Sequence, residues 1–416
     1  MSLSIDAERL LDRIQRLGQI GRDAEGRLTR LAVSDADKSA RDLLADWMRA
    51  AGLEIAVDRI GNLFGLWRGA EHGDLPPVMV GSHIDTVIDA GIYDGCYGVL
   101  AGLEMIATLR EAGLQPTCPI AVAAFTNEEG VRYAPDMMGS LVYAGGLAAE
   151  TALATGGNDG TVLGEELARI DYAGNEEPGL PQSRAYVELH VEQGPILECG
   201  GIPIGAVANL QGISWQRITI EGVANHAGTT PMAMRRDAGQ AAARVVTFLR
   251  DQVADAGTVA TVGCMAFAPN AINVIPARAS FTVDLRHPDE AKLLAAEAAL
   301  ARHLDELVRA EGVAISAERL ARFAPVTFDP GIVGLIEQAA ERRGLRSRRM
   351  TSGAGHDAQM IARICPAAMI FVPSTAGISH NPREHTPEAD LIAGANVLLD
   401  VVRQLVSGSH PTFESR

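Results

Sequence analysis

The sequence lacks an excess of positive charge, closely spaced cysteines and any long apolar run. Its formal net charge is -16, with 36 Lys and Arg against 52 Asp and Glu, so a phosphate backbone or an anionic membrane would be repelled. The five cysteines, at positions 96, 118, 199, 264 and 365, show no CxxC spacing, which argues against a disulfide framework and a structural zinc finger. We therefore expect no nucleic-acid partner and no membrane partner.

Targeting and spanning segments are also missing from the pattern. No window approaches the roughly 20 apolar residues of a membrane span. The first segment, MSLSIDAERLLDRIQRLGQIG, interleaves its apolar residues with Asp, Glu and Arg, which predicts an amphipathic helix rather than a signal peptide. Scattered cysteines fit a reducing compartment, so a cytoplasmic protein is expected. With 416 residues, of which 47% are hydrophobic, the chain exceeds what one core usually supports, and two domains are expected.

Strand-like and helix-like segments alternate from about residue 55 to residue 144. An apolar strand, PVMVGSHIDT, precedes the helical segment VLAGLEMIATLREAGL, and a second strand, PIAVAAFTNEE, follows. This alternation predicts an α/β domain with a mainly parallel sheet, in which ligands bind at the carboxyl ends of the strands. The pattern resumes after about residue 325 and finishes in a helix, ADLIAGANVLLDVVRQLV.

Residues 212–325 interrupt this pattern with a different order of elements. A half-exposed strand, GISWQRITIEGV, is followed by a helix, AGQAAARVVTFLRDQV, and by two strands, TVATVGCMAF and ARASFTVDLR. A long helix, EAKLLAAEAALARHLDELVRA, and a short strand near residue 313 complete the order β-α-β-β-α-β. That order predicts an inserted ferredoxin-like α+β domain. The expected domains are thus a catalytic domain formed by 1–211 and 326–416, and the insertion 212–325.

Five candidate metal ligands lie at the ends of predicted strands or in glycine-containing loops. They are His83, Asp94, Glu129, His190 and His380. Each alone has an ordinary explanation, because Asp-Gly is a common turn and a single buried histidine is usually a satisfied core residue. Together they are nitrogen and oxygen donors without sulfur, which suit zinc, manganese or cobalt, and one shared carboxylate would allow a pair of ions. The set therefore favours a two-metal hydrolase.

Two further acids accompany these candidates. Asp85 lies two residues after His83, so on an extended strand its carboxylate can accept the second ring N–H of the histidine and fix the tautomer. A simple capped strand end is the alternative. Glu128 precedes Glu129 at the end of an apolar strand, where adjacent carboxylates repel each other unless a cation neutralises them. A solvated loop tip is the alternative for that pair.

Nine motifs occur in order and at compatible spacings along the chain: GSHIDTV, YDGCYGVLAG, FTNEEGVRY, HVEQGP, GVANHAGTTPM, NVIP, VDLR, TSGAGHD and GISHNPREHT. These motifs span nearly the whole chain, and in them the sequence resembles the M20 metallopeptidase clan, specifically its amidase/hydantoinase/carbamoylase branch. That branch contains N-carbamoyl-L-amino acid hydrolases, β-ureidopropionase and allantoate amidohydrolases. The resemblance implies a di-metal hydrolase domain, an inserted dimerisation or lid domain, and a homodimer.

The resemblance also assigns the metal ligands. It gives His83 and His190 to one ion, Glu129 and His380 to the other, and Asp94 to both as the bridge. Two divalent ions are implied, with zinc expected first and manganese, cobalt or nickel as alternatives. Peptidases of the clan usually have a carboxylate where His190 stands, so this histidine favours the branch that hydrolyses ureido groups.

The catalytic roles come from the same resemblance. Glu128 is implied as the general base that generates a metal-bridging hydroxide, and Asp85 as the partner that orients His83. His226 is implied to stabilise the oxyanion, in many relatives within the active site of the partner subunit.

The implied substrate is a small molecule that carries a ureido group and a carboxylate. The positions that match the family's substrate contacts are Gln193, His226, Asn273, Arg286, Gly353, Ala354 and His356. Arg286 suits a carboxylate, because a guanidinium binds that group through two parallel hydrogen bonds. Without the resemblance a salt bridge is preferred for it, because Asp284 lies two residues away on the same strand face.

The predicted reaction is hydrolysis of the ureido C–N bond of an N-carbamoyl-L-amino acid to the amino acid, carbon dioxide and ammonia. Allantoate amidohydrolase, or β-ureidopropionase, is the alternative with the same mechanism, because the sequence does not identify the residues of the side-chain pocket. A non-catalytic metal-binding homologue is the alternative from another class. The presence of Glu128 together with all five ligands argues against that alternative.

Overall fold

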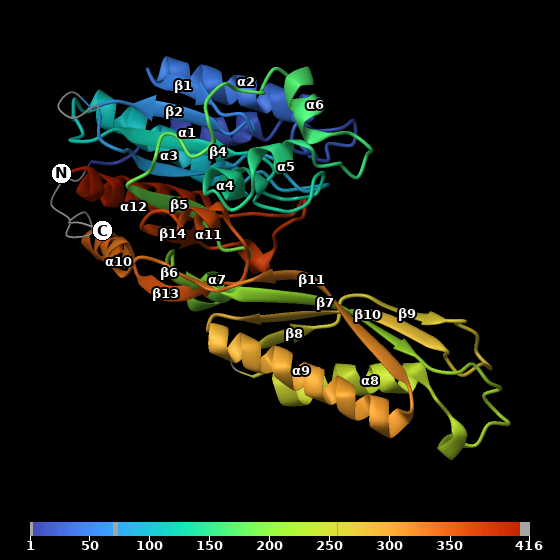
Figure 1. Cartoon of the computed structure of the whole chain (residues 1–416). Helices are drawn as coiled ribbons and strands as arrows, with labels where there is room; N and C mark the ends of the chain where they lie inside the picture. Colours follow the sequence, from blue (N-terminus) through green and yellow to red (C-terminus); the bar gives the residue numbers. More distant parts are fainter. Residues whose placement is uncertain (1–2, 70–73, 256, 408–416) are drawn as a thin grey trace. The chain divides into compact units, whose positions relative to one another are not determined.

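The computed structural model describes residues 3–69, 74–255 and 257–407 (Figure 1). The chain divides into two compact units, one formed by Met1–Ala208 with Phe328–Arg416 and the other by Asn209–Thr327. The predicted insertion, 212–325, lies inside the second unit, and its role as a lid or dimerisation domain stays a prediction. Within the described ranges, no helix combines the length and the apolar character that crossing a membrane requires.

A nine-stranded sheet has the order β1-β2-β4-β3-β5-β14-β6-β12, with β13 paired to β6, and it forms the centre of the first unit, which contains all of its strands except β12 and the last two residues of β6. The strands are β1 (Glu54–Val57), β2 (Leu63–Trp67), β3 (Val78–His83), β4 (Ile120–Phe125), β5 (Ala185–Val191), β6 (Ile204–Leu210), β12 (Val326–Thr327), β13 (Ser347–Ser352) and β14 (Ala367–Val372). The four central strands, β4, β3, β5 and β14, pair in parallel, and the flanking pairs are antiparallel. The predicted α/β class is confirmed.

Helices cover both faces of this sheet, since every residue of the four central strands is buried. The helices are α1 (Ala7–Leu17), α2 (Asp35–Ala50), α3 (Cys96–Glu111), α4 (Met138–Tyr143), α5 (Ala149–Leu153), α6 (Leu163–Arg169), α7 (Ile196–Gly200), α10 (Pro330–Arg342), α11 (Asp357–Ile361) and α12 (Glu388–Val406). The amphipathic α1 buries Leu10, Ile14 and Leu17 against α3. Both strand faces are therefore mostly apolar, as in the continuous hydrophobic runs of the sequence, and β3 and β5 also bury Ser82, His83, Glu188 and His190.

The second unit is an antiparallel sheet in the order β11-β7-β10-β8, with β9 also on β10. Its elements are β7 (Gly212–Glu221), α8 (Ala238–Phe248), β8 (Val259–Thr261), β9 (Met265–Ala268), β10 (Arg278–His287), α9 (Glu290–Glu311) and β11 (Ala314–Phe323). Alternate residues of β10, including Phe281 and Leu285, are buried and join α8 and α9 in one core. This is the predicted ferredoxin-like arrangement.

Two strand predictions in this unit are wrong in detail. The segment expected as one strand, TVATVGCMAF, forms the separate strands β8 and β9, because the backbone N–H of Cys264 donates to the Thr282 side chain instead of a ladder carbonyl. The last strand was expected to be short, yet β11 runs from Ala314 to Phe323 along β7. Most of its residues are exposed, so its sequence lacks the apolar alternation of a half-buried strand.

Candidate metal centre

The parallel strands bring the predicted ligands to one edge of the first sheet. His83 is the last residue of β3, and it lies opposite Phe125, the last residue of β4. The acids that follow β4 are therefore at the same edge. On β5, His190 lies opposite Phe371 of β14, and the loop that leaves β14 carries His380. Carboxyl ends of neighbouring parallel strands form the usual ligand site of such sheets.

Asp94 stands between two groups of these side chains. Its Oδ1 atom is 3.1 Å from His190 Nε2 and 3.7 Å from His83 Nε2. Its Oδ2 atom is 3.2 Å from His380 Nε2, which is 3.4 Å from Glu129 Oε2. The structure thus gathers all five predicted ligands into two clusters that share one carboxylate.

The separations within each cluster fit a divalent metal ion. Two donors about 2.0–2.1 Å from a tetrahedral ion lie roughly 3.3–3.4 Å apart, and the pairs around Asp94 lie 3.1–3.7 Å apart. In addition, the Oε1 atom of Glu129 is buried and receives no hydrogen bond from the described residues. A buried carboxylate oxygen without a donor calls for another partner, and a cation supplies one. The imidazole and carboxylate donors suit zinc or manganese.

Backbone carbonyls orient the two buried imidazoles. His83 Nδ1 lies 3.0 Å from the carbonyl oxygen of Asp85, and His190 Nδ1 lies 2.8 Å from that of Val191. When Nδ1 donates to a backbone carbonyl, Nε2 is the ring atom left for a metal ion, and in both rings it lies 3.1–3.7 Å from Asp94 Oδ1. Both rings are therefore set for metal binding through Nε2.

The carboxylate of Asp85 has a different contact from the one predicted. Its Oδ1 atom is 3.8 Å from His83 Nδ1, too far for a hydrogen bond, because the backbone carbonyl of the same residue is nearer. The carboxylate instead accepts the backbone N–H groups of Glu128 and Glu129, both at 3.3 Å. Asp85 therefore ties the end of β3 to the loop that carries both glutamates.

Burial and the neighbouring charged groups shift the pKa values of several groups at this site. Burial outweighs the attraction of His83 and raises the pKa of Glu128 well above its usual range. Burial, reinforced by the charge of Asp94, raises the pKa of Glu129 to about 8. The hydrogen bond to Asp94 raises the pKa of His380 to about 9. Burial thus disfavours the ionised forms of Glu128 and Glu129, and a bound cation would favour those forms.

Gly95 and Gln193 contact the predicted ligands. Gly95 has a φ of +62°, and a Cβ at this position would lie 2.4 Å from His83 Nε2. Its N–H group points at His190 Nε2 over 3.1 Å. Gln193, predicted as a substrate contact, donates from Nε2 to Asp94 Oδ2 at 2.8 Å. Gln193 thus contacts the carboxylate that the two clusters share, and Gly95 contacts the two histidines of the first cluster.

The second unit brings together two other predicted residues, His226 and Asn273. The N–H of Ala227 donates to the carbonyl of Asn273 at 2.9 Å, so the two loops are paired. The N–H groups of Gly228 and Thr229 donate to His226 Nδ1 at 3.0 and 3.1 Å. Because Nδ1 accepts, the proton of the neutral ring lies on Nε2, which is a hydrogen-bond donor.

Arg286 makes the ion pair that the sequence offered as the alternative to carboxylate binding. Its Nε lies 3.0 Å and its Nη2 lies 2.9 Å from Asp284 Oδ2. The role of Arg286 toward a substrate stays a prediction.

Of the predicted contacts in the TSGAGHD motif, Ala354 has a hydrogen-bond partner within the protein, whereas the buried Nε2 atom of His356 has none among the described residues. The N–H of Ala354 donates to Ser352 Oγ at 3.2 Å, so the backbone donor predicted there has an internal partner. His356 is buried, and its ring centre lies 4.5 Å from that of His190. Burial and the neighbouring His190 lower the pKa of His356 well below its usual value, which makes the ring neutral. Gly353, predicted as the other backbone donor, precedes them in the loop after β13.

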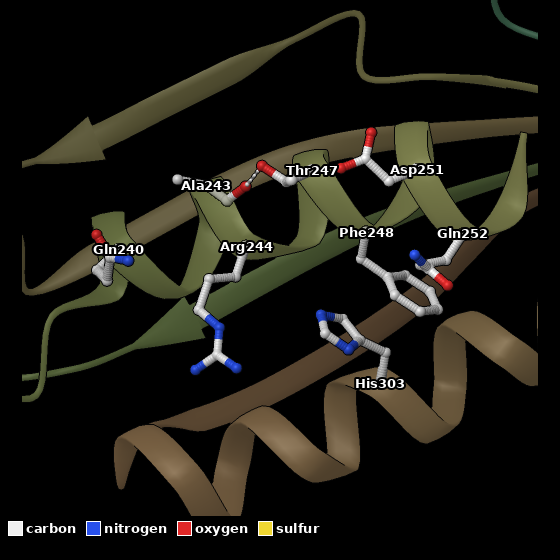
Figure 2. A pocket seen from close by; sticks show the side chains of 8 residues that line it. All are labelled: Gln240, Ala243, Arg244, Thr247, Phe248, Asp251, Gln252 and His303. Carbon is white, nitrogen blue, oxygen red and sulfur yellow. Dashed lines mark hydrogen bonds between the residues drawn. The ribbon is translucent and has the colours of Figure 1, made fainter.

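A separate pocket of the second unit contains none of the predicted site residues. It lies against α8, where Phe248 stacks on His303 of α9 with ring centres 4.0 Å apart (Figure 2). Arg244 also lines it and is paired with Glu311. Its stacked rings and ion pair are those of a packed helical face, and it has no cluster of metal ligands among the described residues.

Sequence reasoning missed two side chains that contact the ligand set. Ser379 Oγ lies 3.2 Å from Asp94 Oδ2 and 3.0 Å from Glu384 Oε1. Both residues flank His380 in the motif GISHNPREHT, which was the available signal. The thiol of Cys96, close to Asp94 in sequence, instead accepts from the buried Arg30 guanidinium at 3.1 Å.

Comparison with known proteins agrees with the resemblance. The profile of Peptidase family M20/M25/M40 matches residues 79–404. An N-carbamoyl-L-amino-acid amidohydrolase from Rhizobium meliloti is 41% identical over 400 residues, 96% of each chain. An allantoate amidohydrolase from Bacillus subtilis is 34% identical, over 95% of this chain and 97% of the relative.

Solved structures extend the agreement to the fold. A crystal structure of an amidase of the hydantoinase/carbamoylase family from Burkholderia multivorans matches with a TM-score of 0.93 and 42% identity. The match covers 97% of this chain and 98% of that one. The chain therefore belongs to peptidase family M20/M25/M40 and, within it, is an amidohydrolase of the hydantoinase/carbamoylase branch.

Proposed function

We propose that the protein hydrolyses the ureido C–N bond of an N-carbamoyl-L-amino acid and releases the amino acid, carbon dioxide and ammonia. The observation that carries the proposal is the position of Asp94 between two ligand clusters, with Glu128 beside them. The 41% identity to an N-carbamoyl-L-amino-acid amidohydrolase over nearly the full length supports this substrate class.

Two divalent ions are part of the proposal, with zinc as the first choice and manganese, cobalt or nickel as alternatives. His83 and His190 would hold one ion, Glu129 and His380 would hold the other, and Asp94 would serve both. When bound, such ions supply Lewis acidity, which polarises a carbonyl group and lowers the pKa of water.

Glu128 is the proposed general base. Its Oε2 atom lies 3.4 Å from His83 Nε2, so the carboxylate faces the first cluster, which is complete without it. It takes the proton of the attacking water and returns it to the nitrogen of the leaving amino acid. The carbamate formed in that step decomposes to carbon dioxide and ammonia. Asp85 holds the Glu128 backbone through its N–H group and so limits the directions open to the base.

Substrate recognition is assigned to residues of both units. His226 donates from Nε2 to the oxygen that gains negative charge in the transition state. Arg286 and Asn273 bind the substrate carboxylate, for which Arg286 must exchange its pairing with Asp284. Gln193, Gly353, Ala354 and His356 are the remaining proposed contacts. A homodimer with the second unit as its dimerisation or lid domain completes the proposal.

Allantoate is the second candidate substrate, because an allantoate amidohydrolase is also related to this chain at 34% identity. The proposed ligands and base serve either substrate, since both carry a ureido group and a carboxylate. The side-chain pocket distinguishes the two, because allantoate has a second ureido group where the amino acid has its side chain.

The test is ammonia release from three compounds offered separately to zinc-loaded and manganese-loaded protein. They are an N-carbamoyl-L-amino acid with an apolar side chain, N-carbamoyl-β-alanine and allantoate. Turnover of the carbamoyl amino acid well above the other two is the expected result. Preferential turnover of allantoate would replace the first candidate by the second. No turnover of any of the three by protein with its metals bound would contradict the proposed function.

A further inference from the structure

A buried carboxylate joins the two loops that supply the bridging ligand and its neighbour. Glu384 lies four residues after His380 and is 7% exposed. Its Oε2 atom accepts the backbone N–H groups of Tyr93 at 3.0 Å and of Asp94 at 3.3 Å. One side chain of the His380 loop therefore holds the backbone of the Asp94 turn, from which it is separated by 290 residues.

Ser379 extends this link to the side chain of Asp94. Its hydroxyl oxygen lies 3.0 Å from Glu384 Oε1 and 3.2 Å from Asp94 Oδ2. That Oδ2 atom is also the one 3.2 Å from His380 Nε2. The single proton of this hydroxyl can be donated to only one of the two carboxylates at a time, so Glu384 and Asp94 together limit the Ser379 rotamer and keep its oxygen beside the Asp94 oxygen that faces the second ligand cluster.

The Asp94 turn is shaped to receive this carboxylate. A Cβ at Gly91 would lie 2.1 Å from Glu384 Oε2 and 2.4 Å from its Cβ, so only glycine lets the turn pack directly on Glu384. The base of the His380 loop is held separately, because Thr386 Oγ1 donates to the carbonyl of Pro373 at 2.9 Å. Because this hydrogen bond holds the base of the His380 loop independently of Glu384, the contact of Glu384 with the Asp94 turn determines where that turn lies relative to His380.

We propose that Glu384 is a positioning residue for the second ion, acting through Ser379 and the Asp94 backbone to set the separation between Asp94 Oδ2 and His380 Nε2. The inference rests on the proposed two-ion function and extends it to side chains that bind neither ion. Partners that orient metal ligands typically contribute about 10- to 100-fold to metal affinity. Loss of this link weakens the ion at Glu129 and His380 more than the other ion, because Ser379 contacts Asp94 Oδ2 and not the Oδ1 atom that lies beside His83 and His190.

The test is equilibrium dialysis of the full-length protein against Zn²⁺, with wild type expected to bind two ions per chain. Glu384→Ala and Ser379→Ala should each weaken one of the two ions, by about 10- to 100-fold for Glu384→Ala. Glu384→Gln should keep both ions, because its carbonyl oxygen can accept the same two backbone N–H groups while its amide donates to Ser379. The Ser379 hydroxyl then donates to Asp94. If Glu384→Ala does not fold, Ser379→Ala, which removes one hydroxyl, carries the test.

Asp58→Ala is the matched control. Asp58 is also buried, and its Oδ1 accepts the N–H groups of Ile60 and Asn62 while its Oδ2 accepts the Asn62 amide. This repeats the three-donor pattern of Glu384 without contact to a proposed ligand, so the variant should lose stability and still bind two ions.

Three results would overturn the inference. The first is wild-type Zn²⁺ affinity at both sites in Glu384→Ala and Ser379→Ala. The second is an equal loss of one ion in Asp58→Ala, which would show that the effect follows from general destabilisation. The third, fewer than two ions bound by the wild type, would overturn the proposed two-ion function together with this inference.

Discussion

Replacing Gly95 by alanine should remove one metal ion from the protein while leaving the fold intact. The new Cβ would lie 2.4 Å from His83 Nε2 and 2.5 Å from two carbon atoms of the same ring. Since ordinary contacts to a Cβ begin at 3.4 Å, the ring must retreat by about 1 Å. Metal–ligand distances tolerate only about ±0.2 Å, so His83 can no longer serve the ion that it shares with His190.

The backbone adds a smaller cost to this substitution. Gly95 has a φ of +62° and a ψ of -50°, a sparsely populated conformation that costs a residue with a Cβ on the order of 1–3 kcal/mol. Gly113 is the control for a positive φ, because it has a φ of +67° and a Cβ there would meet nothing within 4 Å. Gly113→Ala should therefore show the backbone cost without the loss of an ion.

Zinc stoichiometry by equilibrium dialysis, urea unfolding and ammonia release would be measured for both variants. Gly95→Ala should bind one zinc ion per chain in place of two and lose turnover, whereas Gly113→Ala should bind two and keep it. Two tightly bound ions and normal turnover in Gly95→Ala would refute the assignment of His83 as a ligand.

Three further predictions concern the base, the metals and the core. Glu128→Gln should lower kcat by about 10²- to 10⁴-fold with unchanged zinc stoichiometry, and wild-type ammonia release from this variant would exclude Glu128 as the base. Chelation should abolish turnover and lower the Tm, because ions that bind only the folded chain stabilise the folded state. A Tm that neither chelation nor added zinc changes would count against a metal centre. Glu104→Ala should lower the free energy of unfolding, measured with urea, by at most about 3–5 kcal/mol, because Arg9 and Arg13 lose a fully buried partner at 2.7 and 3.1 Å. A decrease under about 1 kcal/mol would show that these ion pairs are as weak as those on a protein surface.

The proximity of the five candidate ligands could be predicted from the sequence because each candidate follows a recognisable apolar strand or lies in a glycine-containing loop. Parallel strands such as β3, β4 and β5 end at the same edge, so the topology implies that His83, Glu129 and His190 lie close together. The same logic applies to the α/β class, because long buried strands and helices have clear periodicities. The full length of β11 was not predicted, because an exposed edge strand does not need alternating apolar residues.

The hydrogen-bond partners of individual atoms could not be predicted from the sequence in this way. The sequence spacing predicts that the Asp85 carboxylate orients His83. In the structure the backbone carbonyl of Asp85 does so, and the sequence gives no sign of this contact because every residue has a backbone carbonyl. The link from Glu384 to Asp94 joins segments 290 residues apart, and no periodicity reports such a pairing. The ion pair of Arg286 with Asp284 was foreseeable, because residues two apart on a strand share a face.

The most direct test of the two-ion centre is anomalous diffraction at the zinc absorption edge from crystals of the zinc-loaded protein. Two peaks about 3.5–4 Å apart are predicted, one beside His83 and His190 and one beside Glu129 and His380, with Asp94 between them. A single peak, or two peaks that Asp94 does not bridge, would contradict the account.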